Sequence, residues 1–407
     1  MSCLTVASTD VVVVGGGIIG SSVAYYLSKQ GMKVTLFERR ELASEASGSN
    51  QGASSSQLMS GENLKLVRES SRIYSTLDRE LEYDFELDWT GSYLLMDKLE
   101  QWPALEEHAK WLQERGIKTE LLTGNELRQI NPGLAPDIPG ASFCAEDFMV
   151  NPMKLVIGFA EASKRLGAEI NAFTPVDKIA VDNGKVQSVT TNKGELMTKF
   201  LVVAAGAWSP LIGRMLKLRL PIKPRRGQVL VTEAYPLERM RSMIDIDYLV
   251  TGYSQQTVKI TDEQRIKHGV ACTLTQTKNG NWLIGSSRDF PGYVKRTNVE
   301  TLTAIARRAN RFFPKLSQAN VIRTMAGLRP FCEDGRFIID KVDEIEGVVL
   351  AIGHHGTGVS LAPVTGQLVA EMIAKNRKPS SIEEFSYTRF KNHSLEGKEL
   401  TEAGNAS

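Results

Sequence analysis

Near the start of the chain, the order of hydrophobic and polar residues predicts a strand, a glycine turn, a helix and a second strand. Residues 11–14 are four consecutive valines, which is typical of a strand buried on both faces. Residues 18–29 (IIGSSVAYYLSK) have apolar positions at helical spacing, and residues 33–37 (KVTLF) are again an apolar strand. This order predicts an α/β domain with a parallel sheet.

The turn between the first strand and the helix has the glycine spacing of a dinucleotide-binding site. Gly15, Gly17 and Gly20 give the pattern G-x-G-x-x-G, and Glu38 follows Gly20 by 18 residues. Such glycines permit the tight turn, the approach of a pyrophosphate and close helix packing, and the acid accepts hydrogen bonds from the ribose. The alternative is a purely structural turn with a solvated Glu38. The complete unit favours an adenine dinucleotide and leaves NAD or FAD open.

Two later segments repeat the strand-to-glycine design. Residues 200–209 (FLVVAAGAWS) and 347–363 (GVVLAIGHHGTGVSLAP) each run from an apolar strand into small residues, and the second precedes a helix at 364–374. Because parallel strands end at the same edge of a sheet, we expect all three ends to meet in one crevice.

The segments between these strands have a different pattern. TGSYLLMDKLE, SFCAED, PRRGQVLVTEA and NGNWLIGSSRD alternate or run apolar over short lengths with Gly and Asn breaks, which predicts an antiparallel sheet. We therefore predict a second, substrate-binding domain made of residues 86–145 and 218–322. It is inserted into a discontinuous dinucleotide-binding domain of residues 1–85, 146–217 and 323–390, with a polar tail at 391–407.

Composition narrows the class of protein. The chain has 407 residues, 42% hydrophobic and 24% charged, with a formal net charge of +2, so nucleic acid is not an expected partner. Cys3, Cys144, Cys272 and Cys332 are scattered, which argues against a disulfide scaffold or a metal site in this chain and suits a cytoplasmic location. No apolar run is long enough for a membrane span, and residues 1–10 do not resemble a signal peptide.

Taken together, the motifs resemble those of the FAD-dependent amino-acid oxidase family. That group includes D-amino-acid oxidase, glycine oxidase, the sarcosine oxidases and the flavin subunits of several amino-acid dehydrogenases. The similar stretches are VVVVGGGIIGSSVAYYLSKQGMKVTLFER, ASGSNQGA, INPGL, VNPMKL, LVVAAGAWS, RRGQ, MAGLRPFCEDG and GHHGTGVSLAP. The resemblance implies non-covalent FAD and an α/β plus α+β fold: a Rossmann-like FAD-binding domain with an inserted antiparallel-sheet substrate domain.

The resemblance also implies which residues bind the cofactor. The first turn would line the pyrophosphate, Glu38 and Arg39 the ribose and adenine side, and Val176 the adenine through its backbone. The helix that follows Gly358 would point its positive end at the flavin region that becomes anionic on reduction. The full expected set is Gly15, Gly17, Ile18, Ile19, Gly20, Glu38, Arg39, Ser47, Asn50, Gln51, Gly52, Val176, Ala205, Gly206, Trp208, Gly327, Arg329, Gly353, His354, Gly356, Thr357, Gly358 and Val359.

Arg329, in AGLRP, matches the arginine that binds the substrate carboxylate in the family. A guanidinium suits a carboxylate because two parallel hydrogen bonds fix its position and orientation. The alternative is an ion pair in the core with Asp334 or Asp340. Arg226 is a further candidate for contact with flavin or substrate, or for a salt bridge at the strand edge.

His354 and His355 are adjacent, and each is either a packed histidine or a catalytic acid or base. Without a nearby carboxylate or cysteine cluster the pair does not indicate a metal, and packing is the favoured interpretation. Tyr248 and Tyr253 lie where some relatives place a tyrosine that binds the carboxylate or closes the site. These four residues complete the candidates for catalysis.

The resemblance implies oxidation of a small, secondary amino acid. Hydride would pass from the α-carbon or the N-alkyl carbon to flavin N5, giving an imine that water hydrolyses. We expect a β-type subunit of a dehydrogenase complex, in a hetero- or homo-oligomer, with FMN and an iron–sulfur centre shared with or carried by electron-accepting partner subunits. The alternatives are a stand-alone oxidase that uses dioxygen, an FAD-dependent 2-hydroxy-acid dehydrogenase, and a non-catalytic subunit that FAD only stabilises.

Overall fold

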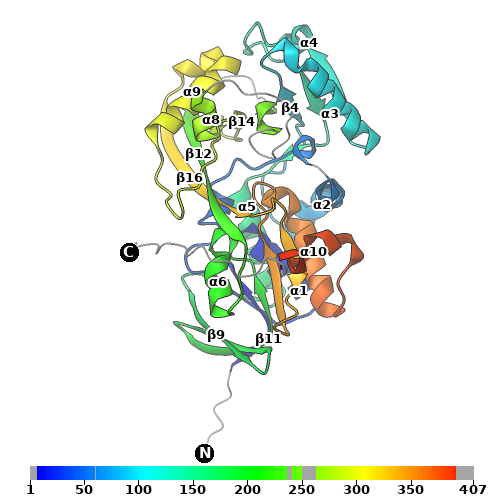
Figure 1. The fold of residues 1–407 in the computed structure, drawn as a ribbon, viewed down its shortest axis with the longest axis vertical. Coiled ribbons are helices and arrows are strands. Elements are labelled where there is room, and N and C mark those ends of the chain that lie inside the picture. The colour runs from blue at the N-terminus through cyan, green and yellow to red at the C-terminus, as the bar shows by residue number, and fades with distance from the viewer. Residues whose placement is uncertain (1–6, 60, 236–240, 250–262, 391–407) are drawn as a thin grey trace, which may run out of the picture.

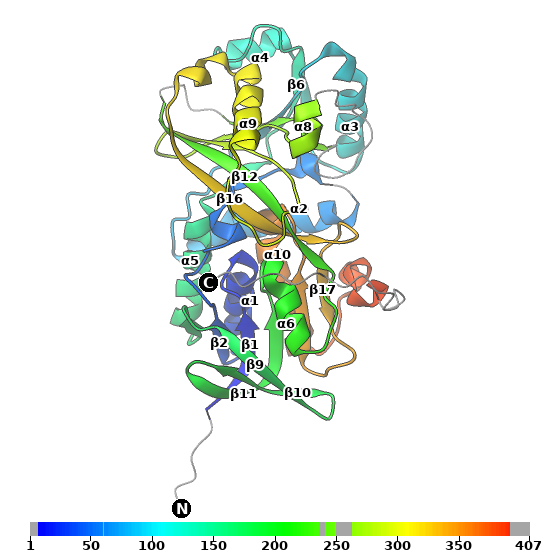
Figure 2. The ribbon, with the colours of Figure 1, turned by 60° about the vertical axis from the view of Figure 1, so that its left-hand side comes forward.

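The protein folds around two large β-sheets that lie one above the other (Figure 1). The structure is a computed structural model and describes residues 7–59, 61–235, 241–249 and 263–390. Cys3, Tyr253 and the predicted tail at 391–407 lie outside the described residues. Figures 1 and 2 both place the first sheet, with strands β9 and β11, in the lower half of the molecule and the second sheet in the upper half.

The first sheet confirms the predicted parallel core. Its central strands β18, β11, β1, β2 and β8 are parallel neighbours, β17 is an antiparallel edge, and β10 and β9 extend from β11. In sheet order the strands are β17 (Ile338–Lys341), β18 (Val348–Ile352), β11 (Gly194–Val203), β1 (Ser8–Val14), β2 (Val34–Phe37) and β8 (Glu169–Asn171), with β9 (Val176–Asp182) and β10 (Lys185–Thr191).

The valine run of β1 is buried on both faces, as its sequence predicts. Val11 and Val13 pack on one face with the helices, whereas Val12 and Val14 pack on the other face with β9, β10 and α6. The helices of this half are α1 (Ile18–Lys29), α2 (Glu62–Leu81), α5 (Pro152–Arg165), α6 (Ser209–Met215) and α10 (Gly358–Ala374).

Helix α10 begins at Gly358 and continues through Pro363, so it is longer than the predicted helix at 364–374. A proline inside a helix has no N–H for the carbonyl four residues earlier, which here belongs to Val359. The Tyr74 hydroxyl donates a hydrogen bond of 2.6 Å to that carbonyl oxygen. The helix therefore passes through the proline without leaving this buried acceptor unpaired.

The second sheet is antiparallel except for the parallel pair β13–β4. Its order is β16 (Val321–Cys332), β12 (Ile222–Ala234), β15 (Asn281–Gly285), β14 (Thr273–Gln276), β13 (Ser242–Asp245), β4 (Ser92–Leu95), β6 (Gly140–Cys144) and β5 (Thr119–Thr123). The helices of this half are α3 (Trp102–Glu114), α4 (Gly124–Ile130), α8 (Glu263–His268) and α9 (Val299–Phe312). A small two-stranded sheet, β3 (Ala53–Ser54) with β7 (Phe148–Met149), lies apart from both.

Alternation along these strands separates a packed face from a cavity face. Leu230, Met243 and Leu274 belong to a core with α9, whereas the neighbours Val229 and Thr273 line a cavity. Strand β16 pairs with β12 along most of its length and crosses the predicted domain boundary at residue 323. The domain boundaries themselves stay a prediction.

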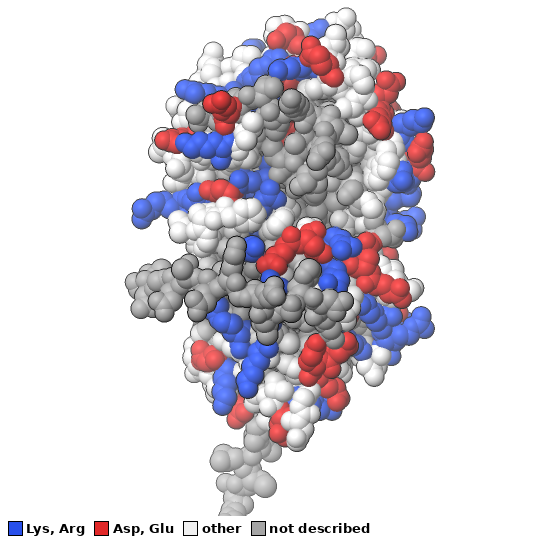
Figure 3. Space-filling model, viewed as in Figure 1, with Lys and Arg blue, Asp and Glu red and all other residues white. Residues whose placement is uncertain are grey.

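No helix among the described residues is long and apolar enough to cross a membrane. On the face drawn in Figure 3, lysine and arginine alternate with aspartate and glutamate over most of the described surface.

Candidate functional site

A large cavity brings together residues from both sheets. Its volume is about 430 Å³, and it is lined by the carboxyl ends of β1, β11 and β18 and by the inner face of the second sheet. The three strand ends therefore meet in one crevice, as the sequence predicts. Every expected cofactor or substrate residue among the described ones lines the cavity except Gly20, Arg226 and Thr357.

The glycine turn leaves no room for side chains. Gly15 has φ +117°, and a Cβ there would lie 2.5 Å from the Ala204 carbonyl oxygen. At Gly20 a Cβ would lie 1.9 Å from the Gly15 oxygen, so this glycine acts by letting α1 approach β1. Gly17, the N-cap of α1, has no side chain that could cap the helix, no acid occupies the first turn, and Gly17, Ile18 and Ile19 all line the cavity. The positive end of α1 thus points into the cavity.

Glu38 lies at the end of β2 beside the same turn. Its carboxylate accepts hydrogen bonds from Gly16 N (2.7 Å) and Arg40 N (2.9 Å). The Thr174 N–H donates to the Glu38 carbonyl (2.7 Å), which holds the segment leading to Val176 against Glu38. The Arg39 guanidinium lies 4.2 Å from the centre of the Trp208 ring, so the two expected residues cover this part of the cavity together.

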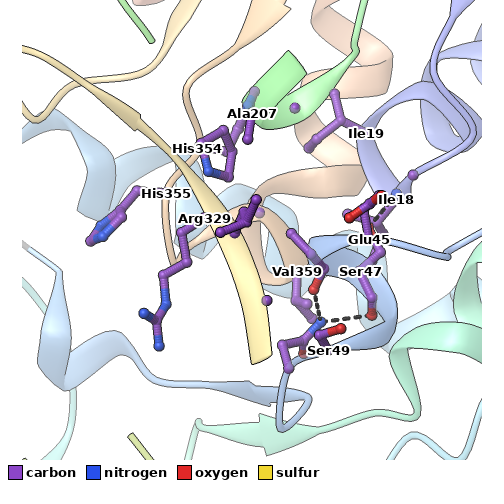
Figure 4. Close-up of a pocket in the computed structure, with 18 of the residues that line it drawn as sticks. Ile18, Ile19, Glu45, Ser47, Ser49, Ala207, Arg329, His354, His355 and Val359 are labelled. Carbon is purple, nitrogen blue, oxygen red and sulfur yellow. Dashed lines mark hydrogen bonds between the residues drawn. The ribbon is translucent and has the colours of Figure 1, made fainter. Parts of the chain in front are cut away.

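Residues 46–52 form the wall of the cavity that faces the glycine turn. Asn50 organises it: the amide donates to Ala46 O (3.0 Å) and Ser47 O (2.7 Å) and accepts from Gly52 N (2.8 Å). Ser47 Oγ accepts from the Ile18 N–H at the start of α1 (2.9 Å) (Figure 4). Gln51 reaches the second sheet, where its amide donates to the carbonyls of residues 273 (3.0 Å) and 283 (2.7 Å).

The end of β18 and the start of α10 form the wall nearest Arg329. Gly353 has φ +81°, and Gly356 has no heavy atom within 4 Å of an added Cβ. The hydroxyl of Thr357, the N-cap of α10, donates a hydrogen bond to His354 O (2.7 Å) and so holds the turn between β18 and α10. The N-terminus of α10 therefore faces the cavity, as that of α1 does.

Arg329 projects into the cavity from β16, and Figure 4 shows it with His355 on the side opposite Ile18 and Ser47. Its guanidinium donates to Ser287 O (3.0 Å) and Ser286 Oγ (2.8 Å). It lies over Gly227, where a Cβ would be 2.2 Å from Arg329 Nη1. The acids of the alternative interpretation have other partners: Asp334 pairs with Arg389 (2.6 Å) and Asp340 with Lys378 (2.8 Å).

Arg226, the other arginine named from the sequence, forms an ion pair with Asp289 (2.5 Å) and donates to Arg296 O (2.5 Å). It does not line the cavity.

The His354 side chain is packed against neighbouring side chains. Its ring is stacked on Phe337 with centroids 5.0 Å apart, and Nε2 lies 3.1 Å from Thr365 Oγ1. Burial lowers the pKa of His354 to about 3, so the imidazole is neutral near pH 7.

This burial predicts a pH-dependent stability. Between the folded pKa of about 3 and the unfolded value of about 6.5, the unfolded state binds one more proton at His354, so stability falls as the pH is lowered. The free energy of unfolding should decrease by about 1.4 kcal/mol for each pH unit below about 6 from this residue. Urea unfolding of the wild type and His354→Gln at pH 5 and pH 7 measures the difference, and equal slopes would contradict it.

His355 and Tyr248 lie in the arginine-rich part of the site. His355 has φ +48°, and its Nε2 lies 3.2 Å from Arg225 Nη1. Burial, followed by the charges of nearby arginines, holds the pKa of His355 well below its usual value. Tyr248 packs under Arg288, whose guanidinium carbon lies 3.9 Å from the ring centre.

The residues present fit FAD. Two helix N-termini and a glycine turn without Cβ atoms suit a pyrophosphate, and Glu38 suits a ribose. Most of the cavity surface comes from small and apolar side chains, which suits a flat ring system. In the described part of the chain no group of three or more His, Cys, Asp or Glu could hold a metal ion.

The sequence alone did not identify several residues that line the cavity or hold Arg329. Thr273, Thr275 and Val229 belong to the inner face of the second sheet, and Ser286 and Ser287 hold Arg329. The polar-apolar alternation in TLTQ was a usable signal for the two threonines. No local pattern connects GSSRD with Arg329, which is more than 40 residues away.

Comparison with known proteins agrees with this geometry. The family model DAO, described as FAD dependent oxidoreductase, matches residues 10–372. A hydrogen cyanide synthase subunit HcnC of Pseudomonas aeruginosa is 27% identical, over 94% of this chain and 96% of the relative. A glycine oxidase of Bacillus licheniformis is 29% identical, over 93% of this chain and 97% of the relative. The crystal structure of L-proline dehydrogenase from P. horikoshii has a TM-score of 0.84 at 26% identity, over 95% and 99%.

Proposed function

This chain belongs to the DAO family of FAD-dependent oxidoreductases, and from that premise we propose that it oxidises a carbon–nitrogen bond of a small amino acid. One observation carries the proposal: Arg329 enters the same cavity as the dinucleotide cradle, and its guanidinium is held in place by Ser286 and Ser287. A fixed guanidinium is suited to orienting a carboxylate, because two parallel hydrogen bonds determine both its position and its direction.

When bound, FAD would supply a two-electron acceptor for the hydride of a substrate C–H bond. The amine enters in its neutral form, having given its proton to bulk water, and loss of the hydride leaves an iminium that water hydrolyses. The chain contributes position and environment. Arg329 holds the carboxylate, and apolar residues such as Leu58, Met59 and Ile244 keep the cavity poor in water. The neutral His354 adds no charge. Hydride transfer removes no proton from the reacting carbon, so the proposed chemistry requires no side-chain base there.

For the finer assignment, we propose a dehydrogenase that acts on a secondary amino acid and passes electrons to a partner subunit. The likeness to a subunit of hydrogen cyanide synthase and to an L-proline dehydrogenase supports this form. The FMN or iron–sulfur centre predicted above would then belong to the partner. The likeness to glycine oxidases supports the alternative, a stand-alone enzyme that uses dioxygen.

Anaerobic titration of the purified protein tests the proposal. We expect amino acids with one or two carboxylates, among them glycine, sarcosine, both prolines and an opine, to include one that bleaches the oxidised flavin. Bleaching only by lactate or 2-hydroxyglutarate would overturn the proposal in favour of a hydroxy-acid enzyme. Flavin that no candidate bleaches would favour a structural subunit. After air is admitted, rapid return of the colour indicates an oxidase, and persistent bleaching indicates a dehydrogenase that needs a partner.

A further inference from the structure

Three arginines gather at the end of the cavity that holds Arg329. Arg225 on β12 lies directly opposite Arg329 on β16 in the antiparallel register. Residues directly opposite in such a pair point to the same face, so both side chains leave the sheet on one side. Arg288 follows β15, the strand that pairs with β12 on its other edge. Arg226, one residue further along β12, forms its ion pair with Asp289 instead.

The two additional arginines contact residues that line the cavity. Arg225 Nη1 lies 3.2 Å from Nε2 of His355, and because a guanidinium only donates, the imidazole nitrogen accepts. The Arg288 guanidinium covers the Tyr248 ring at 3.9 Å. His355 and Tyr248 both line the cavity with Arg329. Arg225 and Arg288 thus lie directly behind His355 and Tyr248, which line the space that a substrate would occupy.

The charge of this end is strong enough to affect the cavity residues. Burial alone would raise the pKa of Tyr248, yet the charges of Arg288, Arg329 and Arg225 outweigh burial and lower it. Burial lowers the pKa of His355, and the same three arginines lower it further. The three arginines therefore act on both cavity residues.

One carboxylate needs only one guanidinium, and Arg329 provides it. The register places the Arg225 guanidinium on the same side of the sheet as Arg329, so a second guanidinium is available beside the first. A positive cavity end also discriminates against substrates without a matching charge. Resting on the function proposed above, we infer that the substrate is an amino acid with a second carboxylate, and that Arg225 and Arg288 select it.

The test compares matched substrates that differ only in the second carboxylate. Suitable pairs are iminodiacetate with N-ethylglycine, aspartate with 2-aminobutyrate, and glutamate with norvaline, the last two as both enantiomers. We expect kcat/KM for anaerobic flavin reduction to be on the order of 10- to 100-fold higher for the dicarboxylate of at least one pair. Arg225→Met and Arg288→Met should each reduce this ratio by about tenfold.

Lys223→Met provides the matched control. Lys223 lies two residues before Arg225 on the same strand, is exposed and pairs with Glu333 at 3.5 Å, so its removal should leave the ratio unchanged. Equal kcat/KM values of the wild-type enzyme within every pair would overturn the inference, and this result does not depend on whether an arginine variant folds. The proposed amino-acid oxidation would still stand. A selectivity that Lys223→Met removes equally would also overturn it. Flavin that no amine-containing acid reduces would remove the proposed function itself.

Discussion

Replacing Arg329 with methionine is expected to reduce kcat/KM for the amino-acid substrate by roughly 200- to 30,000-fold. The range corresponds to the loss of two charge-assisted hydrogen bonds of about 1.5–3 kcal/mol each. Most of the loss should appear as a higher KM, because a carboxylate is bound equally before and during the reaction. Arg329→Lys keeps the positive charge but not the two parallel donors of the guanidinium, so its kcat/KM should fall less. Anaerobic flavin reduction at several substrate concentrations measures both parameters.

Arg323→Met provides the matched control for this experiment. Arg323 lies on the same strand, β16, six residues earlier, and is exposed. The same substitution there should change neither parameter. The visible spectrum of each variant reports whether FAD is still bound, which separates loss of substrate binding from loss of the cofactor. An Arg329→Met enzyme with wild-type KM would contradict the assigned role.

Replacing Gly20 with alanine should prevent stable FAD binding. A Cβ at this position would lie 1.9 Å from the backbone oxygen of Gly15, so α1 would have to move away from the turn. Backbone atoms cannot rotate aside as a flexible side chain can, and we expect the free energy of unfolding to fall by about 3 kcal/mol. The same displacement moves the N-terminus of α1 away from the pyrophosphate position. Flavin absorbance after gel filtration and urea unfolding measure the two effects.

Gly31→Ala separates this effect from a general loss of glycine. Gly31 lies just beyond the other end of α1, has φ +78°, and has no heavy atom within 4 Å of an added Cβ. Alanine there should cost about 1 kcal/mol of backbone strain and leave the FAD content unchanged. A Gly20→Ala protein that retains stoichiometric flavin would contradict the packing argument.

The local elements near the N-terminus could be predicted closely. The helix expected at 18–29 is α1, Ile18–Lys29, and the valine run is part of β1. These elements follow from periodicity and from glycine positions, which act between residues close in sequence. Helix α10 shows where this reasoning ends. Its passage through Pro363 depends on the Tyr74 hydroxyl, which is almost 300 residues away in sequence.

The chemistry at the cavity end depends still more on long-range contacts. The sequence by itself determined the glycine turn and the crevice at the ends of three strands, and its resemblance to the family pointed to Arg329 as the candidate for carboxylate binding. Only the tertiary structure decided that Arg225 faces Arg329, that Arg288 covers Tyr248, and that Arg226 pairs with Asp289. Neighbouring arginines in RRG have opposite surroundings because side chains alternate along a strand, and strand pairing decides which face meets the cavity.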